Sequence, residues 1–287
     1  MDPKQLVMLA LQVSIVSIVF SFGLRSTLDN LLYLWRRPGL LLRSLFAVLV
    51  VMPVLAVLLT RLFDLRDTVE TTLVALAISP MPPLLPQKEI QAGGRRSYAL
   101  ALLVTMAALA VVACPLAVEL LAAYYGRPFG VASGTIARIV LVTVFLPLVA
   151  GIAVRAWLPG TAERLASLVG RAANVLLALA ALILLTGVWR SLWAAVGDGT
   201  VIALLAFVVI GLLVGHLLGG PDPDTSVVLA LSTASRHPAI ALSIASVNFP
   251  DERFGGTILL YLIVGTLAAI PYLAWYRRRA SREASFA

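Results

Sequence analysis

Two adjacent ionisable residues, Arg236 and His237, lie in the middle of an apolar segment that runs from about residue 224 to 248. An ionisable side chain at such a position in a membrane segment is costly and usually has a function. A guanidinium can pair with a carboxylate or sulfonate, and the neighbouring imidazole can bind the same anion or transfer a proton. The pair therefore predicts an anion site. A structural ion pair of Arg236 with Glu89 or Glu70 is the competing interpretation.

Prolines interrupt this apolar segment and one earlier segment. Pro238 follows the Arg-His pair, and Pro80, Pro82, Pro83 and Pro86 crowd the end of the segment at about 68–92. Each proline removes a backbone donor and clashes with the preceding turn. Irregular backbone at membrane depth is tolerated only where protein or a water-filled cavity covers it. Two such segments are typical of inverted-repeat carriers, in which half-helix ends meet near the midplane.

The residues around the two interruptions form the predicted substrate-binding set. Its members are Arg236, His237, Ser79, Pro80, Pro82, Pro83, Gln87, Ser232, Thr233, Ser235 and Pro238. Lys88 and Glu89 follow the first interruption, where a lysine either reaches toward the interface or lines an inward-facing vestibule.

The composition indicates a protein dissolved in lipid. Hydrophobic residues make up 61% and charged residues 13% of the 287 residues, whereas soluble domains are about half apolar and a quarter charged. Long runs of Leu, Ala and Val favour membrane helices over the alternating strands of a barrel. The predicted fold is an all-α polytopic membrane protein with about nine transmembrane helices, at about 5–24, 40–60, 68–92, 97–121, 134–156, 171–189, 199–218, 224–248 and 256–276.

The whole chain, 1–287, is expected to form one transmembrane carrier domain. A first repeat would span about 5–125 and a second about 130–277, with a basic tail at 278–287. Nine crossings place the termini on opposite sides. Fourteen of the 22 Lys and Arg residues fall on the side of the C-terminus and seven on the other side. Because cytoplasmic loops favour Lys and Arg, we expect the N-terminus outside and the C-terminus in the cytoplasm, in a cell (inner) membrane.

Several other function classes are not supported by the sequence. The net charge of +8 fits cytoplasmic loops, and no basic run is interleaved with stacking aromatics, so nucleic acid is not an expected partner. The single cysteine, Cys114, can form neither an internal disulfide nor a metal cluster. His216 and His237 lie in separate predicted helices without a matching metal set. We therefore expect neither an enzyme nor a bound metal or other cofactor.

A series of short motifs carries a family resemblance. It comprises Ser21-Phe-Gly-Leu-Arg25, Arg36-Arg37-Pro38, Ser79-Pro80, Ala92-Gly-Gly-Arg95, Cys114-Pro115 and Arg236-His-Pro-Ala-Ile-Ala-Leu242. In this order, the chain resembles the bile acid/sodium symporter family, in the nine-helix version that lacks the first helix. The resemblance implies two broken helices, the third and eighth, that cross in a core of the second to fourth and seventh to ninth helices. The first, fifth and sixth would form a panel, and alternating access would move one part against the other.

The residues expected at the family's sodium sites differ in this sequence. Sodium-coupled members have a Ser-Asn pair after the first break, where Leu85 and Pro86 stand here. They have a Glu before the second break, where Ser232 stands, and a Gln-Asn pair where Arg236 and His237 stand. Of the hydroxyls on the following helix, Thr105 is the nearest counterpart. A positive pair repels a cation, so these differences argue against sodium at the usual sites.

The sequence thus predicts a secondary active or facilitative transporter of a small organic anion. Its coupling ion would be H⁺, through His237, or absent; Ser232 and Thr105 are further possible coupling positions. A sodium symporter with substituted ligands, such as backbone carbonyls with Ser232 and Thr233, stays open as an alternative. A membrane-embedded sensor or partner subunit is another. The expected partners are the anion and the lipid bilayer, and the sequence gives no oligomeric state.

Overall fold

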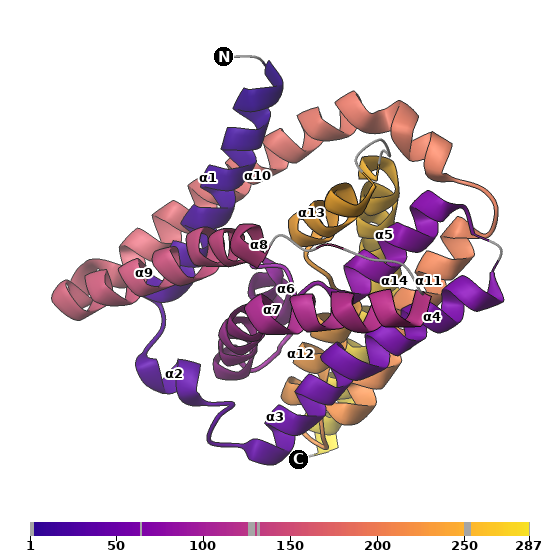
Figure 1. Cartoon of the computed structure of the whole chain (residues 1–287). Coiled ribbons are helices and arrows are strands. Elements are labelled where there is room, and N and C mark those ends of the chain that lie inside the picture. The colour runs from indigo at the N-terminus through magenta and orange to yellow at the C-terminus, as the bar shows by residue number, and fades with distance from the viewer. Residues whose placement is uncertain (1–2, 64, 126–129, 131–132, 250–253, 287) are drawn as a thin grey trace.

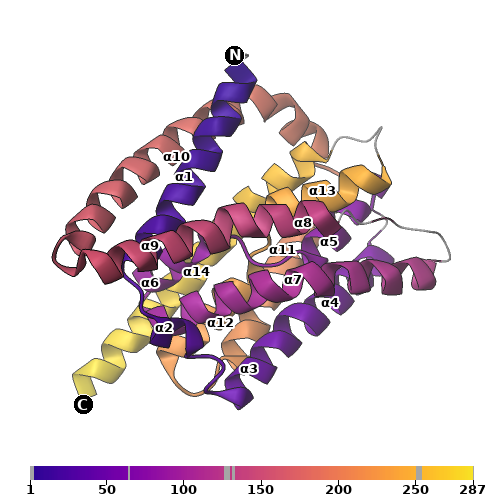
Figure 2. The ribbon, with the colours of Figure 1, turned by 60° about the vertical axis from the view of Figure 1, so that its left-hand side comes forward.

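The computed structural model describes residues 3–63, 65–125, 130, 133–249 and 254–286, and every regular element in these ranges is helical. The helices run past one another as a polytopic bundle, and the two ends of the chain lie at opposite ends of the molecule (Figures 1 and 2). The predicted basic tail continues the last helix as far as Phe286, and Ala287 lies outside the described residues.

Within the described ranges, eight helices or closely joined helices are long and apolar enough to cross a membrane. Their elements are α1 (Pro3–Leu24), α3 (Pro38–Leu45) with η1 (Phe46–Val51) and α4 (Met52–Leu62), α7 (Arg96–Tyr125), α8 (Ser133–Val140) with η2 (Leu141–Phe145) and α9 (Leu146–Trp157), α10 (Pro159–Ala195), α11 (Thr200–Leu218), α12 (Pro223–Ala234) with α13 (Pro238–Asn248), and α14 (Gly255–Phe286). The short α2 (Leu28–Leu32) lies in the first loop. These eight correspond to eight of the nine predicted spans.

The predicted span at 68–92 consists of two short helices, which is why it is missing from the eight. Helix α5 (Asp67–Ile78) has 12 residues and α6 (Leu85–Gln91) has 7. Non-helical backbone between them holds Pro80, Pro82 and Pro83, and Pro86 sits in the first turn of α6, where its missing N–H has no helical partner to lose. The predicted interruption is therefore present.

The second interruption is shorter than the Ser232–Pro238 stretch that predicted it. Helix α12 continues through Ser232 and Thr233 to Ala234, and only residues 235–237 are non-helical. Helix α13 then begins at Pro238, whose fixed φ suits a first helical position. Ser and Thr continue the helix because their hydroxyls bond to its own carbonyls, as Thr233 does to Leu229.

The helices separate into two packed groups. Helices α1, α9 and α10 pack on one another, and their buried residues form small apolar clusters around Ile18, Phe22, Leu24 and Ala166. The main apolar cluster joins α3–α8 with α11–α14. Figures 1 and 2 show α1, α9 and α10 together at one side of the bundle. The resemblance implied this grouping for the panel and the core, with one difference: α8, the first part of the fifth predicted span, packs with the core helices α7 and α13.

Helix α10 is much longer than predicted. The sequence predicted a span at 171–189, whereas the helix runs from Pro159 to Ala195. Arg164, which lies before the predicted span, and Arg171, its first residue, are therefore both well inside the helix. The predicted bounds came from mean hydropathy, which falls where charged residues begin. The helix itself continues into that polar region because Pro159 suits its first position and good helix formers follow.

A stripe of glycines along α11 and at the residue just after it holds α12 in place. Gly211, Gly215 and Gly219 recur every four residues and face Ala234, Ala230 and Ser226 of α12 in the reverse order. A Cβ added to Gly215 would lie 2.5 Å from the Ala230 Cα. Small residues at this spacing let membrane helices approach at backbone distance. The stripe fixes α12, and with it the second interruption, against α11.

Candidate functional site

The two broken helices cross at their interruptions. Helix α5 packs against α13, and α6 packs against α12, so each half of one broken helix faces the opposite half of the other. The backbone N–H of His237 donates to the Pro80 carbonyl at 2.7 Å, which joins the two interruptions directly. The crossing therefore brings together the two stretches that supplied the predicted substrate-binding set.

Arg236 lies at the centre of the crossing and is 1% exposed. Its Nη1 donates to the Ser79 carbonyl at 3.4 Å, and its Nη2 donates to the carbonyls of Val48 at 3.4 Å and Thr233 at 3.1 Å. Ser79 and Thr233 are near the C-terminal ends of α5 and α12, where carbonyls are unpaired and carry partial negative charge. The guanidinium thus occupies a cage of carbonyls. Among the described residues, no ion pair joins Arg236 to Glu89 or Glu70.

The third carbonyl of this cage comes from a widened turn in the second span. Residues Phe46–Val51 form the π-helical turn η1, which ends just before Pro53. Pro53 has no N–H to donate to the preceding turn, and its ring crowds that turn. Widened turns leave carbonyls without their usual helical partner. The Val48 carbonyl is thereby open to Arg236.

His237 caps α13 with its side chain. The imidazole Nδ1 accepts from the Ile240 N–H at 3.4 Å, and Nε2 has no partner among the described residues. The acceptor role of Nδ1 means that the proton of the neutral ring sits on Nε2. The ring is 6% exposed.

The predicted hydroxyl residues face different surroundings. Ser79 and Thr233 donate to carbonyls of their own helices, and Ser235 is half-buried in the second interruption. Thr105 on α7 is buried, and its Oγ1 has no partner among the described residues. Ser232 instead reaches across the crossing to α6. Gln87 is separated from the others and lines a cavity.

Glu89 is the acceptor for Ser232 and is a residue that the sequence did not assign to the site. It is 0% exposed, and Ser232 Oγ donates to its Oε1 at 2.5 Å. Its Oε2 has no partner among the described residues. Glu89 followed the first interruption in the sequence, but nothing there indicated that it would turn toward α12 rather than toward a vestibule.

A cavity of about 290 Å³ lies between the panel and the core on the side of α6. The residues that line it are Ile18, Ser21 and Phe22 of α1 with Arg25 just after that helix, Gln87, Ile90 and Gln91 of α6, Arg96 and Leu100 of α7, and Ala166, Ser167, Gly170, Arg171 and Asn174 of α10. Three are arginines, and none of the described lining residues is acidic. Arg25 pairs at 2.9 Å with Glu163 beside the cavity. This cavity is therefore suited to an anion.

Helical spacing could have revealed part of this cavity from the sequence. On α10, Ser167, Gly170, Arg171 and Asn174 follow an i, i+3, i+4, i+7 pattern that places them on one face. Ile18, Ser21, Phe22 and Arg25 have the same spacing, with Arg25 one residue past the end of α1. Which helices bring these faces together is a property of the tertiary packing, so the sequence did not identify them as one site.

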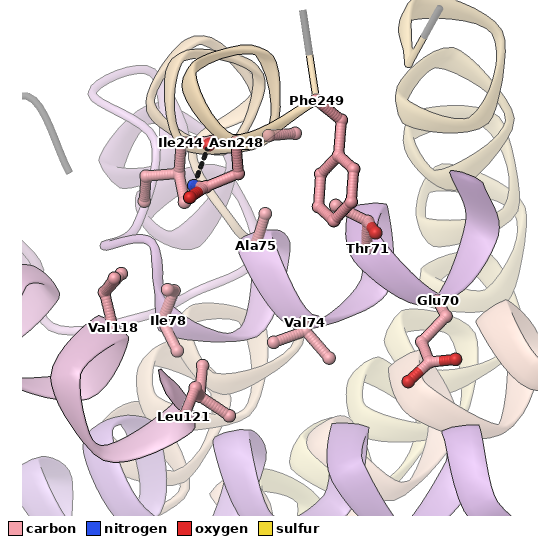
Figure 3. Close-up of a pocket in the computed structure, with 11 residues that line it drawn as sticks. Glu70, Thr71, Val74, Ala75, Ile78, Val118, Leu121, Ile244, Asn248 and Phe249 are labelled. Atoms are coloured by element: carbon pink, nitrogen blue, oxygen red, sulfur yellow. Dashed lines mark hydrogen bonds between the residues drawn. The ribbon is translucent and has the colours of Figure 1, made fainter. Parts of the chain in front are cut away.

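The opposite side of the crossing is narrow and mostly apolar. There a cavity of about 50 Å³ lies between α5, α7 and α13 (Figure 3), with Glu70 as its one charged lining residue among those described. Asn248 closes its end: Nδ2 donates to the carbonyls of Ile244 at 2.7 Å and Gly130 at 2.8 Å, and Oδ1 accepts from the Gly130 N–H. The larger space thus lies on the α6 side.

An ion pair joins the starts of α7 and α12 beside the larger cavity. Arg95 Nε donates to Asp224 Oδ2 at 2.7 Å, and the backbone N–H of Arg95 donates to the Asp224 carbonyl. The hydrogen bond to Asp224 raises the pKa of Arg95. Tyr33 adds a further contact to the same guanidinium at 3.1 Å. These contacts hold the starts of α7 and α12 together next to Arg96, which lines the larger cavity.

Comparison with known proteins gives one match. A family model described as the Sodium Bile acid symporter family matches residues 12–195, which is more than half of the chain. The matched range includes the first interruption and every residue that lines the larger cavity. No curated protein matches the chain. Within the described residues, no group of three His, Cys, Asp or Glu side chains is placed to hold a metal ion.

Proposed function

The chain belongs to the sodium bile acid symporter family, and we propose from this premise that it is a secondary carrier of a small organic anion. Transport would follow alternating access, with the panel of α1, α9 and α10 moving against the core. Members of this family are transporters and the protein is a multi-pass membrane protein. The substrate class and coupling are our proposal.

The cavity between panel and core is the observation that supports an anionic substrate most directly. Arg25, Arg96 and Arg171 line it from three separate segments of the chain, and Gln87 and Asn174 add amide groups. Arginine binds carboxylate or sulfonate oxygens through two parallel N–H groups. An anion between the panel and the core would bridge the two parts whose relative movement opens and closes the path.

The residues of the crossing complete the proposed path. Arg236 supplies positive charge at the centre, and the proposed binding set around it comprises Ser79, Pro80, Pro82, Pro83, Gln87, Ser232, Thr233, Ser235, His237 and Pro238. We place the N-terminus outside and the C-terminus in the cytoplasm of an inner membrane, because of the Lys and Arg bias of the loops. The larger cavity would then face the cytoplasm. The repeats at about 5–125 and 130–277 are part of the same proposal.

Arg96→Gln and Arg171→Gln test the cavity as an anion site. Benzoate, succinate and taurocholate represent a monocarboxylate, a dicarboxylate and a sulfonate, and each is added to the purified protein in detergent during thermal unfolding. A ligand of the folded state stabilises it by about 2.7 kcal/mol at 100 times its Kd. We expect one of these anions to raise the Tm of the wild type, and each variant to bind it at least about tenfold more weakly.

Arg138→Gln is the matched control, because it removes an arginine from α8 outside the residues that line this cavity. Equal weakening in the control would show a general effect of net charge. Undiminished binding in both cavity variants would remove the cavity from the proposed path.

Sodium is expected to have no specific effect on the folded protein. The guanidinium of Arg236 already fills the carbonyl cage at the crossing, in which half-helix ends would otherwise hold a cation. The Tm of the wild type, with or without the stabilising anion, should therefore be the same in NaCl as in KCl of equal concentration. A Tm raised by Na⁺ alone would favour the sodium-coupled alternative instead.

A further inference from the structure

We infer that Glu89 is the site at which the carrier takes up and releases a proton, with Ser232 as its partner across the crossing. This inference rests on the proposed function for its coupling role, although the proton site itself can be measured without transport. Glu89 belongs to α6 and Ser232 to α12, so the site joins one half of each broken helix, the two halves that pack against each other.

The surroundings of the Glu89 carboxyl group fit a neutral acid. The side chain is 0% exposed, Oε1 accepts from Ser232, and Oε2 has no partner among the described residues. An ionised carboxylate buried without a counter-cation is costly, and such groups take up a proton instead. A proton on Oε2 would remove the charge without disturbing the bond that Oε1 accepts.

The charged and titratable groups near Glu89 have other partners. On α7, the Tyr98 hydroxyl bonds to Ser44 at 2.8 Å, and Arg95 just before this helix pairs with Asp224 at the start of α12. Lys88 on α6 is exposed. Beyond the end of α12, Arg236 donates to carbonyls and His237 caps α13.

Three further arginines line the cavity and are not paired with Glu89. They are Arg25 just after α1, Arg96 on α7 and Arg171 on α10. None of the ion pairs among the described residues includes Glu89. Its charge is therefore balanced by a proton rather than by a protein cation.

Glu89 suits this role better than His237, which the sequence had suggested. The neutral imidazole already uses Nδ1 as an acceptor. A second proton on it would place a positive charge beside the adjacent Arg236, where like charges repel. A proton on Glu89 cancels a charge, whereas a proton on His237 adds one.

Helix α6 links the proton site to the cavity. Gln87 and Gln91 are four residues apart, so they share one helix face, and both line the cavity. Glu89 lies between them in sequence and on the opposite side, toward Ser232. A rotation or shift of this seven-residue helix that follows the anion would also change the access of Glu89 to water. Helix α6 thus connects the proposed anion site in the cavity with the proposed proton site at Glu89.

Infrared difference spectroscopy tests the proton site on the purified protein. Spectra recorded over a pH series should show the C=O stretch of a protonated carboxyl group, lost as the pH rises. We expect Glu89→Gln to abolish this band, and Glu119→Gln, which alters an exposed carboxylate on α7, to retain it. A band that persists in a folded Glu89→Gln protein would overturn the inference.

A second variant keeps the test decisive if Glu89→Gln does not fold. Ser232→Ala retains the carboxyl group but removes the hydrogen bond to Oε1, so it should change the frequency of the same band. An unchanged frequency would show that the titrating acid is not the one that Ser232 contacts, and would also overturn the inference.

Proteoliposomes test whether this proton is coupled to the anion. Wild-type protein should accumulate whichever of the three test anions stabilised it when the solution outside the proteoliposomes is acidic. Glu89→Gln should lose this accumulation while exchange of labelled anion, at equal concentrations on both sides, remains measurable. Accumulation equal to wild type in Glu89→Gln would contradict proton coupling at this site. If the wild type moves none of the three anions, the proposed function loses its support and the infrared band alone decides the proton site.

Discussion

Arg236→Gln is expected to abolish anion uptake into proteoliposomes and to lower the stability of the folded protein. The substitution removes the positive charge at the crossing and leaves the carbonyls of Ser79, Val48 and Thr233 without their donor. Hydrogen bonds from a charged donor contribute about 1.5–3 kcal/mol each when short. These are long, so we expect a total loss of about 2–4 kcal/mol, seen as a lower Tm.

Arg236→Lys tests whether the positive charge is sufficient or whether the shape of the guanidinium group is also needed. An ammonium is a single point charge and cannot reach three carbonyls in three directions. We expect this variant to fold more weakly than wild type and to lose most of its uptake. Uptake close to wild type in Arg236→Lys would mean that charge alone suffices, and uptake close to wild type in Arg236→Gln would remove Arg236 from the proposed path.

Gly215→Val is expected to destabilise the folded protein strongly, through the contact between α11 and α12. Its Cβ would meet the backbone of α12 at Leu229 and Ala230, which cannot move as a flexible side chain can. Overpacking in a core typically costs about 1–3 kcal/mol, and contact with backbone places this substitution at about 3 kcal/mol or more. Because α12 holds Ser232 and leads to Arg236, anion binding should fall with stability.

Gly187→Val is the matched control for this substitution. Gly187 lies on α10, and a Cβ there has nothing within 4 Å. Both changes place the same side chain on a membrane helix, so only the contact differs. Yield after detergent extraction and Tm should be near wild type for Gly187→Val. Equal losses in both variants would show that the glycine stripe does not hold α12 against α11.

The two interruptions could be predicted from the sequence because their signals are local. Proline removes a donor wherever it stands, and the crowding of Pro80, Pro82 and Pro83 leaves no helical alternative. Apolar runs likewise give the positions of the spans. The start of α10 was predicted at residue 171 because hydropathy reports only the part of a helix that contacts lipid. The helix in fact begins at Pro159, in polar surroundings, and Arg171 lies at the cavity.

The contacts of the site required the structure. The sequence showed that Arg236 was an unusual residue, and weighed an acidic partner for it against a ligand. It considered backbone carbonyls at the breaks only as ligands for sodium and did not assign them to Arg236, and the carbonyl from the π-helical turn at Val48 was not foreseen. The pairing of Glu89 with Ser232 joins residues 143 positions apart. Such a contact follows from how two broken helices cross, and no spacing within either helix encodes it.

The caged guanidinium of Arg236 bears on the response of the carrier to voltage. A cation fixed to the protein does not accompany the substrate, so it contributes no net charge to each transport cycle. Moving one elementary charge through a membrane potential of 100 mV is worth about 2.3 kcal/mol. A monoanion entering with one proton on Glu89 is electrically neutral, so the pH gradient and not the voltage would drive its entry. A dianion with one proton would still move against a negative interior, and the potential would then favour its export.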